Sequence, residues 1–411
     1  MADTTIVWFH LGLRVDDHPA LAHALSEFER VRAVYVYSEE IFGEWEPGAA
    51  QRWWIHEHLL LLGSRLAELG IELTVTTDSL VDTVLGARPS AVLWNEALTP
   101  AARRAANTLT DALRDRSIGH SVFAGDLLHD PDAIRTNAGS PYRVFTPFYK
   151  SFLQAGVPMP PVDTPEKGRD PVEFDAAAVK DLGLVADHPW VDKLRGHWKP
   201  GERAAADMLD SFLEDHIRDY HERRDLPGIR GTSRLSPYLA VGAIGPRRVW
   251  QEVLTAARAA DLAGEHFPKA GSHAGTDAKG YAGWLRELGW REFGYHLLIH
   301  YPHTTDQPLR EDWAAFPWSM DEGAFERWKR GRTGYPIVDA GMRQLWDSGW
   351  MHNRVRMIVA SFLTKDLMIP WQEGARWFWD TLIDADLASN TLGWQWAAGS
   401  GADAQPFFRI F

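Results

Sequence analysis

The sequence of 411 residues contains no cysteine, which excludes disulfide bonds, thiolate metal ligands and a cysteine nucleophile. It has no apolar run of about 18 residues, so no membrane span is expected. The start of the chain shows no basic stretch followed by an apolar one, so no secretory signal is expected. These absences predict a cytoplasmic protein, and any redox chemistry in it must be carried by a cofactor.

A basic excess is also missing, because the net charge is −13, and this argues against a surface that is basic throughout. Charge can nevertheless gather locally. Residues 327–356 hold only Asp339 and Asp347 as acids, against the bases Arg327, Lys329, Arg330, Arg332, Arg343, Arg354 and Arg356. Either a local nucleic-acid-binding face or an ordinary solvated helix surface is compatible with this pattern.

Tryptophan, by contrast, is abundant. More than half of the 20 tryptophans lie after residue 280. Indole rings stack on flat ring systems and are rarely fully buried, so an apolar core does not need so many of them. The enrichment indicates a stacking surface or an electron relay, and both favour redox or light chemistry on flat heterocycles.

Strand and helix patterns alternate over residues 4–126. Short buried runs occur at Thr5–Phe9, Val31–Tyr37, Ile71–Val75, Ala91–Trp94 and His120–Phe123, with helical patterns such as Arg52–Leu69 and Pro100–Arg116 between them. Alternation of this kind predicts a Rossmann-like α/β domain with a parallel sheet over residues 1–130. No Gly-x-Gly-x-x-Gly follows the first strand, so a dinucleotide site there is not indicated.

The rest of the chain divides into two parts. Residues 131–200 are rich in turn-forming proline and glycine and predict a long interdomain linker. Residues 201–411 are helical in pattern and predict an all-α domain.

Two motifs carry groups suited to a nucleotide. Gly231–Pro237 offers hydroxyls, a guanidinium and a helix start, which suit a phosphate; an ordinary helix N-cap by Ser233 or Ser236 is the alternative. Glu287 and Trp290 lie three residues apart on one helical face, which suits a base that is stacked and hydrogen-bonded at its edge. Taken alone, these two residues favour the alternative of an amphipathic helix with one aromatic stripe.

Two further groups of residues have spacings that suit ligand binding. Asn353 and Met357 share a helical face, and the nearby Arg356 needs an acidic partner, for which Asp384 or Asp386 is available. His296 and His300 have the spacing of zinc ligands, but no Glu stands in the His-Glu-x-x-His position. No metal is therefore expected.

Long motifs resemble the photolyase/cryptochrome flavoproteins, most closely the bacterial class I enzymes that repair cyclobutane pyrimidine dimers (CPD). They are Thr232–Ser236, Gly334–Arg343, Trp350–Arg354, Asp384–Trp396 and Gly399–Asp403. The resemblance implies an FAD-binding helical domain, blue-light-driven electron transfer from reduced FAD to a dimer flipped out of UV-damaged DNA, and a monomeric lyase. A cryptochrome-type photoreceptor without repair activity is the alternative.

The same resemblance assigns residues to roles. FAD is expected to contact Tyr220, Thr232, Ser233, Arg234, Leu235, Ser236, Trp284, Arg291, Asn353, Arg356, Asp384, Asp386 and Asn390, with Asn390 facing flavin N5. The dimer is expected to contact Glu287, Trp290, Asn353, Arg354, Met357 and Trp396, with Arg354, Arg332 or Arg343 near the DNA phosphates. A relay of Trp394, Trp371 and Trp318 is expected to reduce the flavin, and Glu287 and Asn390 are expected to assist the chemistry.

The antenna chromophore remains open on the sequence. The usual polar cluster after the first strand is replaced by His10-Leu-Gly-Leu-Arg14. Ala97 stands where deazaflavin-binding relatives carry Asp, and Ala101-Ala102 stand where folate-binding relatives carry Asn-Glu. Deazaflavin, folate or no antenna at all therefore remain alternatives.

Overall fold

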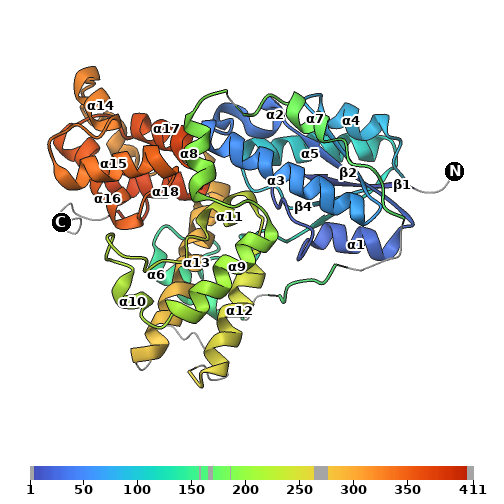
Figure 1. The fold of residues 1–411 in the computed structure, drawn as a ribbon, viewed down its shortest axis with the longest axis horizontal. Coiled ribbons are helices and arrows are strands. Elements are labelled where there is room, and N and C mark those ends of the chain that lie inside the picture. Colours follow the sequence, from blue (N-terminus) through green and yellow to red (C-terminus); the bar gives the residue numbers. More distant parts are fainter. Residues whose placement is uncertain (1–3, 157–158, 165–169, 186, 263–275, 405–411) are drawn as a thin grey trace.

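Figure 1 shows the computed structural model, which describes residues 4–156, 159–164, 170–185, 187–262 and 276–404. The amino-terminal part, coloured blue to cyan, is a sheet covered by helices. The carboxy-terminal part, coloured yellow to red, consists of helices. An α/β domain followed by an all-α domain, as the sequence predicted, is therefore confirmed.

The described residues of the α/β domain form a five-stranded sheet in the order β3-β2-β1-β4-β5. All neighbouring strands are parallel. The strands are β1 (Thr4–Phe9), β2 (Arg30–Val36), β3 (Glu72–Thr76), β4 (Ala91–Asn95) and β5 (Gly119–Phe123). Each agrees with its predicted position to within a residue or two, because buried β-branched runs between turn signals are a strong indicator of strands.

Alternate residues of each strand serve opposite faces of the sheet. In β1, Val7 and Phe9 pack in one apolar cluster with α1 (Pro19–Glu27) and α3 (Ala49–Glu68). Ile6 and Trp8 pack on the other side, with α4 (Leu80–Gly86) and α5 (Pro100–Asp115). Two short helices follow β2, namely α2 (Glu39–Phe42) and the 3₁₀ helix η1 (Gly43–Trp45). Both faces of the sheet are thus covered, which explains its continuous apolar strands.

The stretch predicted as a linker is more ordered than its proline content suggests. It contains α6 (Phe145–Gln154), α7 (Ala176–Asp181) and α8 (Trp190–His197). Helix α6 packs against α13 (Thr276–His300) of the helical domain, whereas α7 packs on α3 and β3 of the α/β domain. The segment therefore contributes packing to both domains as well as connecting them.

The helical domain begins after α8. Its helices are α9 (Glu202–Asp215), α10 (Tyr220–Arg223), α11 (Ser236–Val241), α12 (Pro246–Ala259), α13, α14 (Glu322–Lys329), α15 (Pro336–Ser348), α16 (Asn353–Ser361), α17 (Trp371–Thr381) and α18 (Leu387–Ala398). Shorter turns are the 3₁₀ helices η2 (Pro302–Thr305) and η3 (Glu311–Ala315), and the π-helical η4 (Phe362–Asp366). In the part of the chain that the structure describes, no helix has the length and apolarity needed to cross a membrane.

A buried arginine joins the two domains. Arg14 follows β1, and its side chain is almost fully buried. It donates to Asp126 Oδ1 at 2.7 Å and to the Gly242 carbonyl at 3.0 Å, and it also donates to the carbonyls of Asp17 and Gly125. Gly242 belongs to the helical domain, so one guanidinium binds backbone from both domains.

Two glycines allow this approach. The residue after α11, Gly242, has a φ of +69°, and a Cβ there would lie 2.5 Å from the Gly12 backbone. The neighbouring Leu13 N–H donates to the Val241 carbonyl at 3.0 Å. The domains therefore meet backbone to backbone, at a distance that leaves no room for side chains.

Replacing Arg14 with methionine should lower the free energy of unfolding by about 3–5 kcal/mol, because it leaves a buried Asp126 carboxylate unpaired. Urea denaturation of the flavin-free protein measures this loss. Arg65→Met is the control, since the exposed Arg65–Glu68 pair is worth about 1 kcal/mol or less. Similar losses in the two variants would contradict the role given to Arg14.

Candidate functional site

Two adjoining cavities lie between helices of the carboxy-terminal domain. The outer cavity has a volume of about 270 Å³ and is lined from α10, α11, α13 and α16. The inner cavity, of about 150 Å³, lies between α16 and α18. Both are lined by Asn353, Arg356, Asp384, Asp386 and Ser389. One elongated ligand can therefore extend from the first cavity into the second.

All the residues predicted to contact FAD line these two cavities. The outer cavity contains Tyr220, Thr232, Ser233, Arg234, Leu235, Ser236, Trp284 and Arg291, together with the shared Asn353, Arg356, Asp384 and Asp386, and the inner cavity adds Asn390. The fold thus brings together positions that are up to 170 residues apart in the sequence, from 220 to 390. Their individual contacts with a cofactor remain predictions.

One end of the outer cavity carries hydroxyl groups and a cation. Arg234 has a φ of +54°, and its guanidinium lies over the Trp350 ring at 4.9 Å from the ring centre. Trp350 Nε1 donates to Ser236 Oγ at 3.3 Å. The alternative of an ordinary helix cap was wrong, because Leu235 occupies the N-cap position of α11 and no side chain caps it. The hydroxyls of Thr232 and Ser233 line the cavity instead.

The other end of the cavity is built around a buried ion pair. Arg356 Nη2 donates to Asp384 Oδ2 at 2.7 Å, and Arg356 Nε donates to the Met351 carbonyl at 2.7 Å. The acidic partner expected for Arg356 is therefore Asp384. The second carboxylate oxygen, Asp384 Oδ1, is buried and accepts no hydrogen bond within the described residues. A ligand N–H or O–H in the cavity would satisfy it, which is the kind of group that a flavin ring edge or ribityl chain offers.

The residues predicted to bind the dimer are only partly brought together. Glu287, Asn353 and Arg354 line the outer cavity and Met357 lines the inner one. Trp290 lines neither cavity; it stacks on Phe145 with ring centres 3.5 Å apart and an interplanar angle of 8°. Trp396 packs instead against the apolar cluster formed by α14–α18. The two tryptophans expected to stack on substrate are thus engaged elsewhere in this structure.

Two charged residues were missed by the sequence analysis. Arg224 lines the outer cavity and forms an ion pair with Glu287 through its Nη1 atom. Asp225 accepts from Arg354 Nε at 2.6 Å. The run of charges in Tyr220-His-Glu-Arg-Arg-Asp225 was the available signal, but sequence spacing does not show that it faces α13 and α16.

The expected tryptophan relay lies in one apolar cluster. Trp394 lines the inner cavity, and Trp371 is buried in the same cluster. Trp318 packs against that cluster and is half-buried, so it reaches the protein surface. One of the three rings thus lines the cavity and another is partly exposed, while their order as an electron relay stays a prediction. Phe378 in the same cluster lies 5.0 Å from Trp394, ring centre to ring centre.

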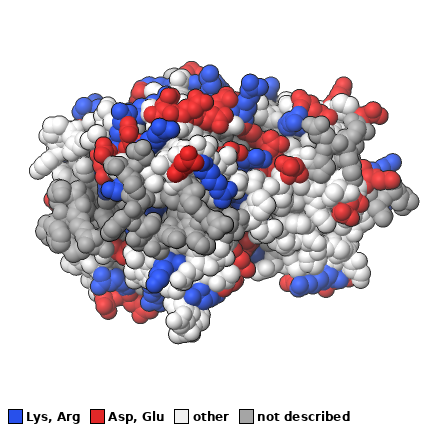
Figure 2. Space-filling view, turned by 90° about the horizontal axis from the view of Figure 1, so that it is seen from below, with Lys and Arg blue, Asp and Glu red and all other residues white. Residues whose placement is uncertain are grey.

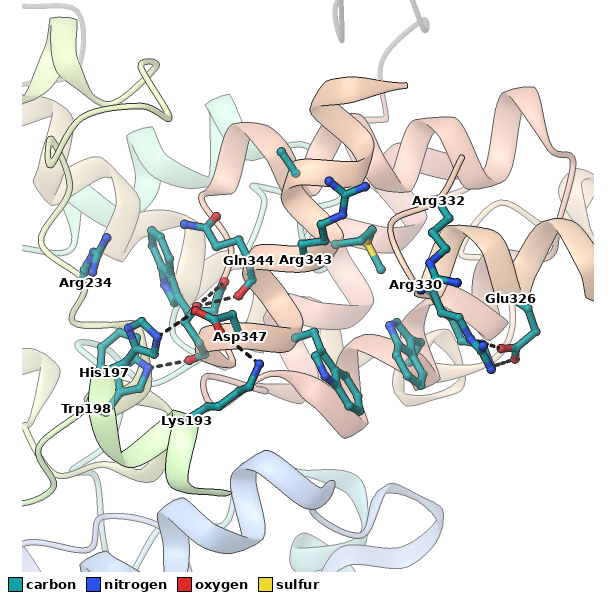
Figure 3. A pocket seen from close by; sticks show the side chains of 17 residues that line it. Lys193, His197, Trp198, Arg234, Glu326, Arg330, Arg332, Arg343, Gln344 and Asp347 are labelled. Carbon is teal, nitrogen blue, oxygen red and sulfur yellow. Dashed lines mark hydrogen bonds and ion pairs between the residues drawn. The ribbon is translucent and has the colours of Figure 1, made fainter. Parts of the chain in front are cut away.

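A larger cavity of about 1010 Å³ lies behind the Arg234–Trp350 pair, between α8 and α14–α15 (Figure 3). Arg332 and Arg343, expected near DNA phosphates, line it together with Lys193, Lys329 and Arg330. Most of these cations have acidic partners. Lys193 pairs with Asp347 at 3.3 Å, and Arg330 pairs with Glu326 at 3.4 Å.

The same neutralisation is seen over the surface. Figure 2 shows Lys and Arg beside Asp and Glu on the face seen from below. Arg343 lies 3.8 Å from Asp339. The basic run of residues 327–356 thus forms local ion pairs to a large extent, and does not stand alone as a cationic face.

A small cavity of about 70 Å³ lies at the carboxyl ends of β1 and β2, where an antenna would be sought. Leu11, Leu13 and Tyr35 line it, and Trp45 and Trp379 occupy part of its wall, edge to face at 5.4 Å. Ala97 and Ala102 are buried beside the sheet. Polar side chains from other positions, among them His10, Gln51 and Thr99, also line this cavity.

His296 and His300 are the pair whose spacing resembles that of zinc ligands. His296 Nε2 accepts from the Tyr142 N–H at 2.9 Å, and burial lowers the pKa of His296 to about 4. Within the described ranges, no group of three or more His, Asp or Glu side chains is arranged to hold a metal ion.

Comparison with known proteins shows which protein family this chain resembles. Residues 284–411 match the family model described as the FAD binding domain of DNA photolyase, and residues 5–166 match the DNA photolyase model. A deoxyribodipyrimidine photo-lyase of Agrobacterium fabrum is 41% identical over 99% of this chain and 82% of its own length. Cryptochrome-2 of Arabidopsis thaliana is 35% identical over 100% of this chain and 67% of its own length.

A solved structure is similar over the whole molecule. The crystal structure of a bacterial class III photolyase from Agrobacterium tumefaciens has a TM-score of 0.88 and 40% identity, and the match covers 100% of this chain and 83% of that one. The inner cavity and part of the outer one are therefore lined by residues of a domain of FAD-binding type, and FAD is the cofactor of this family.

Asp384→Asn should weaken FAD binding by about tenfold to a hundredfold, because charge-assisted hydrogen bonds contribute about 1.5–3 kcal/mol. Titration of flavin-free protein with FAD, followed by flavin fluorescence, measures the affinity. Asp339→Asn is the matched control, since this buried aspartate caps the loop at Thr333 and lies outside both cavities. Wild-type affinity in Asp384→Asn would remove that carboxylate from the cofactor site.

Proposed function

Because this chain belongs to the photolyase/cryptochrome family, we propose that it is a deoxyribodipyrimidine photo-lyase that repairs cyclobutane pyrimidine dimers in DNA under blue light. The observation that carries the proposal is the mouth of the flavin cavity, where Glu287, Asn353 and Arg354 stand together with Met357 just inside. These are the residue types that the resemblance associates with dimer repair. We place the enzyme in the cytoplasm as a monomer acting on UV-damaged DNA.

The cofactor supplies the chemistry and the protein supplies the environment. Bound FAD, once reduced, would supply under light the electron that splits the cyclobutane ring and that returns afterwards. The Thr232–Ser236 segment, with the Arg234 guanidinium, is placed to hold the phosphates at one end of the cavity. At the other end, Arg356 binds Asp384 Oδ2, and Asp384 Oδ1 is left to accept a hydrogen bond from the flavin ring system. Asn390 lines the inner cavity, where its side-chain amide can donate a hydrogen bond to flavin N5 or accept one from it.

A dimer that enters the outer cavity has to replace ion pairs that already exist at the cavity opening. Glu287 is paired with Arg224, and Arg354 with Asp225. When a flipped dimer enters, the Glu287 carboxylate can accept from its imide N–H groups while Arg354 turns to a phosphate. Trp290 stacks on Phe145 with one ring face and is half-buried, so it can meet the dimer with its other face or after leaving Phe145. The low cost of extracting a poorly stacked lesion favours such an exchange over extraction of normal bases.

The class within the family is a finer part of the proposal. The sequence motifs favoured class I. The solved relative with 40% identity and full coverage of this chain is described as class III, and this supports assignment to the class III branch instead. Both assignments keep DNA photolyase activity.

A photoreceptor function is the second candidate, because a plant cryptochrome is 35% identical over the whole chain. It predicts FAD photochemistry without dimer loss. The mouth residues Glu287 and Met357 favour repair, since signalling alone gives no reason to retain a pocket for the dimer.

Repair is tested with an oligonucleotide that contains one thymine dimer, using dithionite-reduced holoprotein under blue light and in the dark. Dimer loss in light alone is the expected result. Glu287→Gln should lower repair by about tenfold or more, because it removes one charge-assisted hydrogen bond to the substrate. Glu252→Gln should not change repair, because Glu252 is a half-exposed residue of α12 that pairs with Arg248 and lines neither cavity. A flavin-loaded protein that leaves the dimer intact would support the photoreceptor function instead.

Photoreduction is tested separately. Trp318→Phe should slow the light-driven reduction of bound FAD by an external reductant, because it removes the surface end of the relay. Repair by chemically reduced enzyme should stay at the wild-type level. Equal photoreduction in the variant and the wild type would show that electrons enter by a route without Trp318.

A further inference from the structure

Two helices that pack against each other, α13 and α18, contribute functional residues to the flavin cavities. Helix α13 presents Trp284, Glu287, Leu288 and Arg291 to the outer cavity. Helix α18 presents Asn390 and Trp394 to the inner one, one helical turn apart. The distance between a bound flavin and these groups depends on how α13 and α18 are fixed to each other.

The start of α18 is held by one aspartate. Asp386 is its N-cap residue, and its Oδ1 accepts from the Ser389 N–H at 2.7 Å. The Asp386 carbonyl accepts from the Asn390 N–H at 2.8 Å, so Asp386, Asn390 and Trp394 follow one another at intervals of four residues. Asp386 also lines both flavin cavities and the small cavity at the sheet edge. A change in the orientation of Asp386 would therefore alter the lining of all three cavities.

The second oxygen of this carboxylate is bound by α13. The Tyr295 hydroxyl donates to Asp386 Oδ2, one helical turn after Arg291. Tyr295 is 2% exposed and packs with Leu387 and Ala388 at the start of α18. Burial, followed by the charge of Asp386, raises the pKa of Tyr295 well above its ordinary value, so its hydroxyl remains a donor.

The Tyr295 ring has a second contact. It supports the Arg291 guanidinium, whose carbon lies 4.8 Å from the ring centre. Arg291 Nη1 in turn donates to the Asp126 carbonyl at 2.8 Å, and Asp126 is the residue that binds Arg14. The contacts of Tyr295 thus connect the interdomain interface, the outer cavity and the first turn of α18.

We propose that Tyr295 is a positioning residue of the flavin site, which fixes α18 through Asp386 and thereby sets how Asn390 and Trp394 face the flavin. The inference rests on the proposed placement of FAD in the two cavities. Tyr295 itself lines neither of them, so its effect on the flavin is exerted through Asp386 and Arg291. Loss of the hydroxyl leaves the core packing of the ring in place and frees one oxygen of the N-cap carboxylate.

The test compares Tyr295→Phe with Tyr37→Phe. Tyr37 is also buried, and its hydroxyl also donates to a carboxylate, Glu46 Oε1 at 3.0 Å, but it lies in the α/β domain outside all the flavin-lining residues. Both variants lose the same kind of hydrogen bond, so their losses in melting temperature should be similar. A structural role alone therefore predicts the same behaviour for both.

Three flavin measurements separate the two variants: FAD affinity, the midpoint potential of bound flavin, and the yield of photoreduction at saturating FAD. Tyr295→Phe should weaken FAD binding by up to about tenfold, because the Asp386 and Arg291 side chains would then have to be ordered when FAD binds. It should also shift the potential and lower the photoreduction yield. Tyr37→Phe should leave all three at wild-type values. Wild-type flavin properties in Tyr295→Phe, or equal changes in both variants, would overturn the proposal.

A double variant tests whether the effect passes through Asp386. If it does, adding Tyr295→Phe to Asp386→Asn should change the midpoint potential little beyond Asp386→Asn alone. Additive shifts would show that Tyr295 acts independently of that carboxylate. A wild-type protein that does not bind FAD would instead refute the flavin placement itself, so the two failures are distinguishable.

Discussion

The structure depends on a buried guanidinium between its two domains. The desolvation of the Arg14 guanidinium is tolerated only because Asp126 and several carbonyls receive its N–H groups. These partners come from the α/β domain and from Gly242 of the helical domain. The same Asp126 offers its backbone carbonyl to Arg291 in the flavin cavity wall. The position of the cavity wall is therefore coupled to the correct docking of the domain that carries the sheet.

Electrostatic pairing also bears on the DNA site proposed for this acidic protein. Of the bases in residues 327–356, Arg354 faces the cavity mouth, and even this residue is held by Asp225. Arg330 and Arg343 lie beside Glu326 and Asp339. In the free protein these arginines are therefore neutralised by carboxylates. They can bind DNA phosphates only by giving up those acidic partners. Affinity should depend on the lesion at least as much as on the phosphate backbone, because phosphates must compete with carboxylates.

The sequence predicted most of the architecture and the composition of the flavin cavity. Buried strands such as β1 and β4 are short apolar runs between turns, and the family motifs carry Tyr220 to Asn390 as an ordered set. What escaped prediction arises from packing between distant segments. The stacking of Trp290 on Phe145 joins α13 to a helix in the expected linker, and no local pattern reports it. Arg224 and Tyr295 were missed for the same reason, since their partners Glu287 and Asp386 lie 63 and 91 residues away.

The close contact at Gly12 and Gly242 has a consequence for biosynthesis. Arg14 and the Gly242 carbonyl are 228 positions apart, and a ribosome adding about 5–20 residues per second needs about 10–45 s to make that stretch. Asp126 emerges about halfway through this interval, so the nascent α/β domain can pair Arg14 with it while the surface awaiting the helical domain is still exposed to solvent. During this time the chain displays bare glycine backbone and apolar residues such as Leu13. Synthesis speed and chaperone capture at this stage should therefore influence the yield of native protein more strongly than the stability of the finished fold does.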